Sequence, residues 1–345
     1  MSERGMGDCE QSSGNLNEAR HLISQLAHVE ISSPDPEESV RWFTDVLGLQ
    51  ESGREGQSVY LRAWGEFFHH SLVVTEGHEP SLLHVGWRTS GPEELERAVK
   101  RIEETGRGEG WLEATTGHGP AYRYRAPGGH LHEVFWEVER WQAPPELATD
   151  FPGRPQRHPR HGVCPRYIDH VTVATPDLVA EARWHQQTLG LKFTDYIVPE
   201  EDSDFVVFAT LTSHSTHELG LVPETSEARG RVNHVAFWLE QRVDVERAAH
   251  ILIDAGTPIE FGPGMHGIDE ITYLYVREPG GMRIELNSGG RRLFEPDWET
   301  RRWTPAQGAM SAYRNIGMPE SMMESFPLPE RAGDLYDTGL FSRRG

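Results

Sequence analysis

The chain contains an internal repeat. The stretch "QLAHVEISSPDPEESVRWFTDVLGLQE" begins at Gln25 and returns, in altered form, as "YIDHVTVATPDLVAEARWHQQTLGLKF" from Tyr167. His28 matches His170 at an offset of 142 positions, and the Pro-Asp pairs at 34–35 and 176–177 match at the same offset. Self-similarity at a fixed period means that one structural unit is used more than once. We therefore expect two halves with a common fold.

The flanking composition marks the limits of these halves. Residues 143–165 hold six prolines in 23 residues, so we expect a linker rather than a core element. We predict a polar arm at 1–20, a first domain at 21–142 and a second at 166–290. The tail at 291–345 carries several apolar residues, and we expect part of it to pack on the second domain as a possible lid.

Each half divides again into two similar units. "HLISQLAHVEI" alternates like a strand and leads into helical spacing after Asp35, a plausible N-cap. A second unit restarts at "LLHVGWRT", and the order returns in the later half with helices near 177–189 and 242–255. The pattern predicts four β-α-β-β-β units, paired into two α+β domains.

Bulk properties exclude several classes of function. The net charge of −21 disfavours binding to nucleic acid or anionic membranes, and no apolar run is long enough to span a bilayer. The two cysteines, Cys9 and Cys164, lie in the arm and the linker, so we expect no structural disulfide and a cytoplasmic protein. The 18 histidines direct attention to metal sites.

Three strands of the second half each offer a metal-ligating side chain. Alternation places His170 in "YIDHVTVA", His234 in "RVNHVAFW" and Glu285 in "GMRIELNS" on inward faces. A buried carboxylate such as Glu285 is costly unless it is paired or metal-bound. Two imidazoles and one carboxylate leave coordination positions open, as in non-haem Fe(II) enzymes. The ordinary alternative for each histidine alone is a hydrogen-bonded core residue.

Three further residues are expected near this set. A type II turn at Pro279-Gly280 would bring Tyr275 opposite Glu285. His266 lies in the glycine-rich stretch "FGPGMHGIDE", and His217 lies on a predicted strand of the third unit. Each has an ordinary alternative as a surface histidine or a core tyrosine.

The segments "HVTVATPDL", "HVAFWLE", "FGPGMHGI" and "TYLYVREPGGMRIEL" together resemble the type I extradiol ring-cleaving dioxygenases, such as catechol 2,3-dioxygenase, homoprotocatechuate 2,3-dioxygenase and dihydroxybiphenyl dioxygenase. The resemblance covers about residues 21–310 and implies the vicinal oxygen chelate fold. It implies that His170, His234 and Glu285 bind Fe(II), or less often Mn(II). It further implies that His217 is the acid/base residue, that His266 lies beside the substrate hydroxyl, and that Tyr275 orients and helps to deprotonate the catechol.

The reaction implied by the resemblance opens a catechol with O₂ next to its two hydroxyls, giving a muconic semialdehyde-type product. No arginine stands in "GTPIEFGPGM", the loop before His266, which favours catechol, alkylcatechols or 2,3-dihydroxybiphenyl over acidic catechols. Family members are usually homotetramers or larger, so we expect a homo-oligomer.

The first half offers an echo of the ligand set in His28, His84 and Glu133, with His70 near the place of His217. Ten residues before Glu133 stands Arg123 instead of a tyrosine, and nineteen before it stands Ala114 instead of a histidine. A cation beside a divalent ion opposes metal binding. We therefore expect the first half to be a structural or vestigial copy that is not catalytic, and the sequence does not decide whether His28, His84 and Glu133 retain metal binding.

Three alternatives remain at this point. Glyoxalase-like lyases share the module but distribute their ligands across paired units. The 4-hydroxyphenylpyruvate dioxygenases use His-His-Glu but give no reason for His217 and Tyr275 together. A metal-free ligand-binding protein of this fold would leave Glu285 without a partner.

Overall fold

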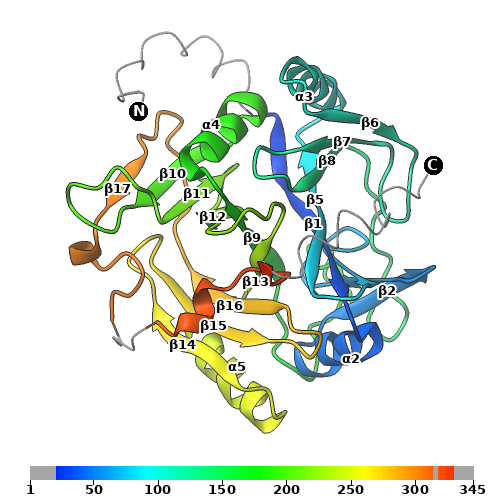
Figure 1. Ribbon diagram of the computed structural model, residues 1–345. Helices are drawn as coiled ribbons and strands as arrows, with labels where there is room; N and C mark the ends of the chain where they lie inside the picture. The colour runs from blue at the N-terminus through cyan, green and yellow to red at the C-terminus, as the bar shows by residue number, and fades with distance from the viewer. Residues whose placement is uncertain (1–20, 314–317, 330–345) are drawn as a thin grey trace.

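The computed structural model describes residues 21–313 and 318–329, so the predicted arm at 1–20 lies outside it. Figure 1 shows two sheets side by side, with helices on their outer surfaces. None of the described helices is long and apolar enough to cross a membrane.

The first half consists of two β-α-β-β-β units, as predicted. The first unit is β1 (Ile23–Ser33), α2 (Pro36–Arg41) with the π-helical turn η1 (Trp42–Val46), β2 (Gln50–Glu55), β3 (Ser58–Arg62) and β4 (Leu72–Glu76). The second is β5 (Ser81–Thr89), α3 (Pro92–Glu104), β6 (Gly108–Leu112), β7 (Ala121–Arg125) and β8 (Leu131–Phe135). They form one sheet in the order β2-β3-β4-β1-β5-β8-β7-β6.

The second half repeats this order. Its third unit is β9 (Tyr167–Thr175), α4 (Leu178–Leu189), β10 (Lys192–Ile197), β11 (Phe208–Thr212) and β12 (Leu219–Pro223). Its fourth is β13 (Val232–Trp238), α5 (Arg242–Asp254), β14 (Ile259–Met265), β15 (Ile271–Arg277) and β16 (Arg283–Gly289). The sheet order is β14-β15-β16-β13-β9-β12-β11-β10-β17, so β9, β13 and β16 lie together near its centre.

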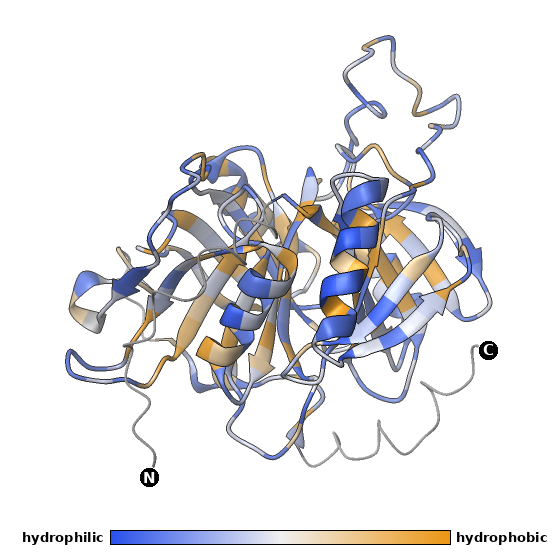
Figure 2. Cartoon of the chain, turned by 90° about the horizontal axis from the view of Figure 1, so that it is seen from above, coloured by the Kyte–Doolittle hydropathy of each residue, from blue (hydrophilic) through white to orange (hydrophobic). Residues whose placement is uncertain are grey.

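Local sequence signals explain the helix ends. The side chain of Asp35 accepts from the backbone N–H of Glu38, and that of Asp177 accepts from Ala180, which satisfies a free N–H at each helix start. Gly190 ends α4 in the left-handed conformation that glycine adopts without steric cost. Figure 2 shows hydrophilic residues on the exposed faces of the helices and hydrophobic residues concentrated in the strands.

The connector is irregular, whereas the described part of the tail adds short elements to the second half. Residues 143–165 contain no helix or strand. In the described part of the tail, β17 (Arg301–Trp303) extends the second sheet beside β10, and two short 3-10 helices follow, η2 (Pro305–Gln307) and η3 (Glu320–Met323). Phe326 is buried and pairs with Val232 of β13. The described part of the tail therefore packs on the second sheet.

Three local predictions were wrong. Most of the stretch "GTPIEFGPGM", expected to be a loop before His266, forms β14, which runs from Ile259 to Met265. The turn between β15 and β16 has the hydrogen bond from Gly281 N–H to the Glu278 carbonyl, but the residue with positive φ is Gly281, not Gly280. The turn is therefore not type II, which would need positive φ at Gly280. His217 lies two residues before β12 rather than on it.

Candidate active site

Adjacent strands place three predicted ligands on one face of the second sheet. Ala236 of β13 pairs with His170 of β9 on one side and with Glu285 of β16 on the other. His234 lies two residues before Ala236, so its side chain emerges on the same face. The small side chain of Ala236 leaves the space between these three groups open.

The ligand atoms of these residues converge on one point. Nε2 of His170 lies 3.0 Å from Nε2 of His234, and each nitrogen lies 3.1 Å from Oε2 of Glu285. All three residues are at most 5% exposed. The structure therefore brings the three predicted side chains together.

Partners behind each imidazole fix which nitrogen faces the centre. His170 Nδ1 lies 2.8 Å from Asp169 Oδ2, which also accepts from Asn287 Nδ2. His234 Nδ1 lies 2.7 Å from Asn233 Oδ1, while Asn233 Nδ2 donates to two tail carbonyls, those of Met322 and Glu324. Both Nδ1 atoms therefore carry the proton, and both Nε2 lone pairs point at the centre.

This convergence needs a positive charge between the three atoms. Two lone pairs and a carboxylate oxygen at about 3 Å cannot hydrogen-bond to one another without an added proton or cation. Although burial opposes it, Asp169 and Glu285 raise the pKa of His170 to about 9. Burial lowers the pKa of His234 to about 4. Burial would raise the pKa of Glu285, but His170 and His234 hold it well below its usual range. The donor set fits a divalent metal ion.

Tyr275 and His266 form a polar pair beside the ligands. Tyr275 lies directly opposite Glu285 in the ladder, as the sequence predicted. His266 follows β14, and its Nδ1 donates to the Met310 carbonyl at 2.7 Å. Its Nε2 therefore accepts from the Tyr275 hydroxyl at 3.2 Å. Burial and the nearby Glu285 raise the pKa of Tyr275 well above its usual range, so this hydroxyl keeps its proton at neutral pH.

His217 packs against His170, whereas Tyr275 packs against His234. Its ring centroid is 4.0 Å from that of His170, and its Nδ1 lies 3.1 Å from Asp269 Oδ2. The Asp269 carboxylate is itself paired with Arg291 at 3.0 Å. Because the Nδ1–H of His217 donates to Asp269, Nε2 of His217 is the nitrogen available for proton exchange with a bound molecule.

A cavity of about 210 Å³ joins these groups. Its polar wall is made by the three ligands with His217, Asn233, His266 and Tyr275. Its apolar wall consists of Val207, Phe208, Val222, Pro223, Ile268, Ile271, Met310, Met318, Met322 and Met323. No lysine or arginine lines this cavity in the described part of the chain.

Sequence reasoning missed the residues that orient the ligands. Asp169 and Asn233 each stand immediately before a ligand histidine, and that repeated placement of a polar residue was a usable signal. Asp269 and the tail methionines were missed because they reach the site from loops whose course the sequence pattern does not determine.

The first sheet holds a comparable group around Glu133. His28, His84 and Arg123 lie near Glu133 as the repeat predicts, and Arg123 is directly opposite it in the ladder. The rings of His28 and His70 are 5.1 Å apart. The group also includes His118. The repeat did not predict His118, because the position equivalent to His266, counted back from Glu133, is 114. His118 comes from the β6–β7 loop, which corresponds to the loop that carries His266.

The family model described as the Glyoxalase/Bleomycin resistance protein/Dioxygenase superfamily matches residues 25–134 and 167–286. The chain belongs to this superfamily. A metapyrocatechase of Geobacillus stearothermophilus is 38% identical, over 84% of this chain and 89% of that protein. A manganese-dependent 2,3-dihydroxybiphenyl 1,2-dioxygenase of Geobacillus genomosp. 3 is 35% identical, over 81% of this chain and 90% of that protein.

Solved structures agree with this assignment to the superfamily. The crystal structure of homoprotocatechuate 2,3-dioxygenase from Arthrobacter globiformis has a TM-score of 0.76 and 26% identity, and the match covers 89% of this chain and 92% of that one. The 2,3-dioxygenase LapB from Pseudomonas sp. KL28 has a TM-score of 0.75 and 25% identity, over 83% and 99% of the two chains.

Within the superfamily, the chain is an extradiol dioxygenase, a metal-dependent oxidoreductase that opens an aromatic ring with O₂. The predicted fold, family and reaction type are confirmed. The relatives named here are neither glyoxalase-like lyases nor 4-hydroxyphenylpyruvate dioxygenases.

Proposed function

We propose that this dioxygenase cleaves a catechol with a neutral, apolar substituent, next to its two hydroxyls, at an Fe(II) ion bound by His170, His234 and Glu285. The observation that carries the proposal is the arrangement of ligand atoms. Two Nε2 lone pairs and Oε2 of Glu285 meet at about 3 Å, and the outward Nδ1 atoms are already engaged.

The ligand set supports iron over harder cations. Two imidazoles and one carboxylate are the donors of many non-haem Fe(II) oxygenases, and they leave positions for substrate and O₂. When bound, the ion supplies Lewis acidity and holds substrate and O₂ close together. Mn(II) is the alternative, because one relative is named as manganese-dependent.

Tyr275 and His266 are suited to receive the substrate hydroxyl. The Tyr275 O–H is held by His266 Nε2 at 3.2 Å, and the His266 ring is held by the Met310 carbonyl. A catechol hydroxyl that enters between them can donate to His266 Nε2 and accept from Tyr275. Its proton thereby has a positioned acceptor, and the ring has a fixed orientation.

His217 is suited to transfer a proton beside the ligand group. Asp269 holds its Nδ1–H, which fixes the tautomer and stabilises the ring when Nε2 gains a proton. We propose that His217 Nε2 accepts the proton that the second catechol hydroxyl releases on binding, and then donates that proton to the oxygen derived from O₂. Such a positioned general acid typically contributes about 10²–10⁴-fold to the rate.

The cavity wall supports the substrate class. Four methionines and five other apolar residues face the space beyond the polar groups, together with one proline. Methionine adapts to irregular apolar ligands. A carboxylate on the substrate would find no cationic partner among the described lining residues. Alkylcatechols and 2,3-dihydroxybiphenyl therefore fit better than catechols with acidic side chains.

A substrate comparison tests this proposal. The Fe(II)-loaded enzyme is assayed with 4-methylcatechol, 2,3-dihydroxybiphenyl and 3,4-dihydroxyphenylacetate, and the same series is repeated after loading with Mn(II). We expect a higher kcat/KM for the two neutral catechols and higher activity with Fe(II). A preference for the carboxylate substrate would contradict the substrate class, and higher activity with Mn(II) would contradict the choice of iron. The homo-oligomeric state and the cytoplasmic location stay predictions.

A further inference from the structure

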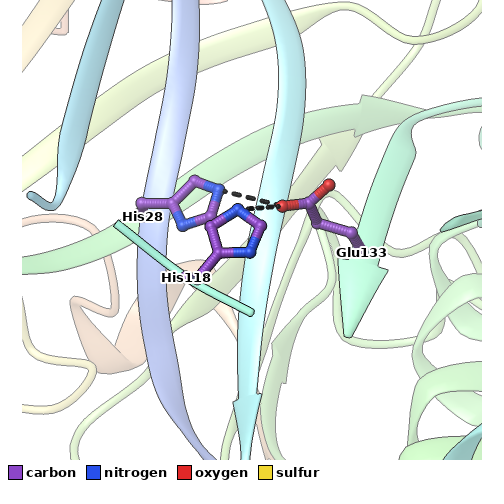
Figure 3. A group of neighbouring side chains, drawn as sticks. All are labelled: His28, His118 and Glu133. Carbon is purple, nitrogen blue, oxygen red and sulfur yellow. Dashed lines mark ion pairs between the residues drawn. The ribbon is translucent and has the colours of Figure 1, made fainter. Parts of the chain in front are cut away.

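A second group of ligand atoms lies in the first sheet. His28 comes from β1, His84 from β5, Glu133 from β8, and His118 from the β6–β7 loop. Figure 3 shows His28, His118 and Glu133 pointing toward one another. Oε1 of Glu133 lies 3.2 Å from His118 Nε2, 3.3 Å from His28 Nε2 and 3.5 Å from His84 Nε2. These four residues are at most 9% exposed.

Among the residues that the structure describes, the central carboxylate oxygen has no hydrogen-bond partner. Glu133 is 2% exposed, and within the described residues its Oε1 makes no hydrogen bond of acceptable geometry, although three imidazole nitrogens surround it. Arg123 reaches only the other oxygen, Oε2, at 3.5 Å. A buried carboxylate oxygen without a hydrogen bond is costly, and a cation among these four atoms would remove that cost.

Two of the imidazoles direct Nε2 lone pairs into the group, where His84 Nε2 also lies 2.8 Å from His28 Nε2. His118 Nδ1 donates to the Gly119 carbonyl at 2.8 Å, and His84 Nδ1 lies 2.8 Å from Oε2 of Glu30. When each Nδ1 keeps its proton, both Nε2 lone pairs point into the group. Thr115 Oγ1 lies 3.0 Å from His118 Nε2 and provides a partner in the metal-free state.

Gly86 explains why this group differs from the one in the second sheet. Gly86 pairs with His28 and with Glu133, as Ala236 does with His170 and Glu285. A Cβ at Gly86 would lie 2.3 Å from Cε1 of His28, so only glycine leaves room for the His28 ring in its present position. That position stacks His28 on His118 at 5.4 Å between ring centroids, which brings His118 into the group.

We propose that His28, His84, His118 and Glu133 bind a second divalent cation with a structural role. Three imidazole nitrogens and one carboxylate oxygen suit Zn(II), whose structural sites are closed and four-coordinate. Burial of the group and its contact with Phe135, 4.5 Å from the His118 ring, leave a bound ion little access to substrate. This inference departs from the expectation that Arg123, and Ala114 in place of a histidine, oppose metal binding in the first half.

Metal counting tests the proposal. The protein is stripped with a chelator, loaded with Zn(II) alone, desalted and measured by elemental analysis. We expect two zinc ions per chain for the wild type, one for His118→Asn and one for Glu285→Gln. The double variant should hold none. His78→Asn replaces an exposed histidine of the same half and should keep both ions.

Several outcomes would overturn the proposal. If the wild type holds one ion, and this ion is lost in Glu285→Gln but kept in His118→Asn, all the zinc lies in the second sheet. Two ions in His118→Asn would also contradict the assigned ligand set. Should His118→Asn not fold, Glu285→Gln decides alone, because the proposal requires it to retain one zinc and to gain thermal stability from zinc. After loading with Fe(II), His118→Asn is expected to keep the ring-cleaving activity.

Discussion

Glu260→Gln should destabilise the second half through a buried arginine. Arg283 is fully buried, and Glu260 accepts from its Nε at 2.8 Å and its Nη2 at 3.0 Å. The same guanidinium donates to the carbonyls of Asn233 and Glu324, at 3.1 and 3.0 Å. It therefore ties the tail to the strand that carries His234. Neutralising Glu260 leaves the Arg283 charge buried without its counter-ion.

The magnitude follows from the pKa of Glu260. Burial would raise this pKa, but hydrogen bonds from Arg283 and Arg277 lower it from 4.5 to about 2. That difference corresponds to roughly 3 kcal/mol of stability at neutral pH, in line with the usual cost of breaking a buried pair. Because the pKa is lower in the folded state, the stabilisation is complete above about pH 4.5. It is lost as the pH falls through about 2.

Thermal unfolding of wild type and variant measures this effect. At pH 7 we expect the Tm of Glu260→Gln to be lower by roughly 6–12 °C, the shift that about 3 kcal/mol causes in a domain of 150–250 residues. The difference between the two Tm values should shrink as the pH falls from 4.5 toward 2. Glu299→Gln is the control, because its side chain is 85% exposed and its contact with Arg301 is 3.6 Å. A Tm change at pH 7 no larger than that of the control would refute this reasoning.

Three predictions concern the site itself. The His217→Phe variant should bind metal normally but turn over about 10²–10⁴-fold more slowly. Steady-state rates together with metal analysis measure this. An unchanged rate would exclude His217 from proton transfer. Asp169→Asn should weaken metal binding about 10- to 100-fold, because it loosens the hold on His170; chelator competition measures this, and equal affinity would contradict it. Metal affinity of the stripped wild type should rise by about tenfold per pH unit from pH 7 toward 9, because the metal displaces the His170 proton, whose pKa is raised to about 9; a flat profile would count against that assignment.

The sequence predicted those features that depend on local periodicity. Alternation with period two assigned His170, His234 and Glu285 to inward faces, and a short hairpin limited the register of Tyr275 to within one residue of Glu285. Repetition of the module then implied that the strands with these residues lie side by side. These inferences hold because strand geometry is regular and needs no knowledge of distant contacts.

Other features depended on how loops reach across the fold. The separation along the chain between His118 and Glu133 differs from that between His266 and Glu285. Counting back from Glu133 by the His266–Glu285 separation therefore did not reach His118. The effect of Gly86 on the His28 ring depends on the pairing of β1 with β5, which the sequence pattern alone does not give. The tail contributes Met322 to the cavity and its carbonyl to Asn233, and no periodic pattern in the tail predicted that contact.

Ring cleavage at the second-sheet metal centre is the central claim, and anaerobic reconstitution tests it most directly. The stripped protein is loaded with Fe(II), mixed with 4-methylcatechol or 2,3-dihydroxybiphenyl, and then exposed to air. We predict a yellow product from cleavage beside the hydroxyls in the wild type, and none in Glu285→Gln. The claim is contradicted if no product forms from wild-type protein that holds iron, or if Glu285→Gln remains as active as the wild type.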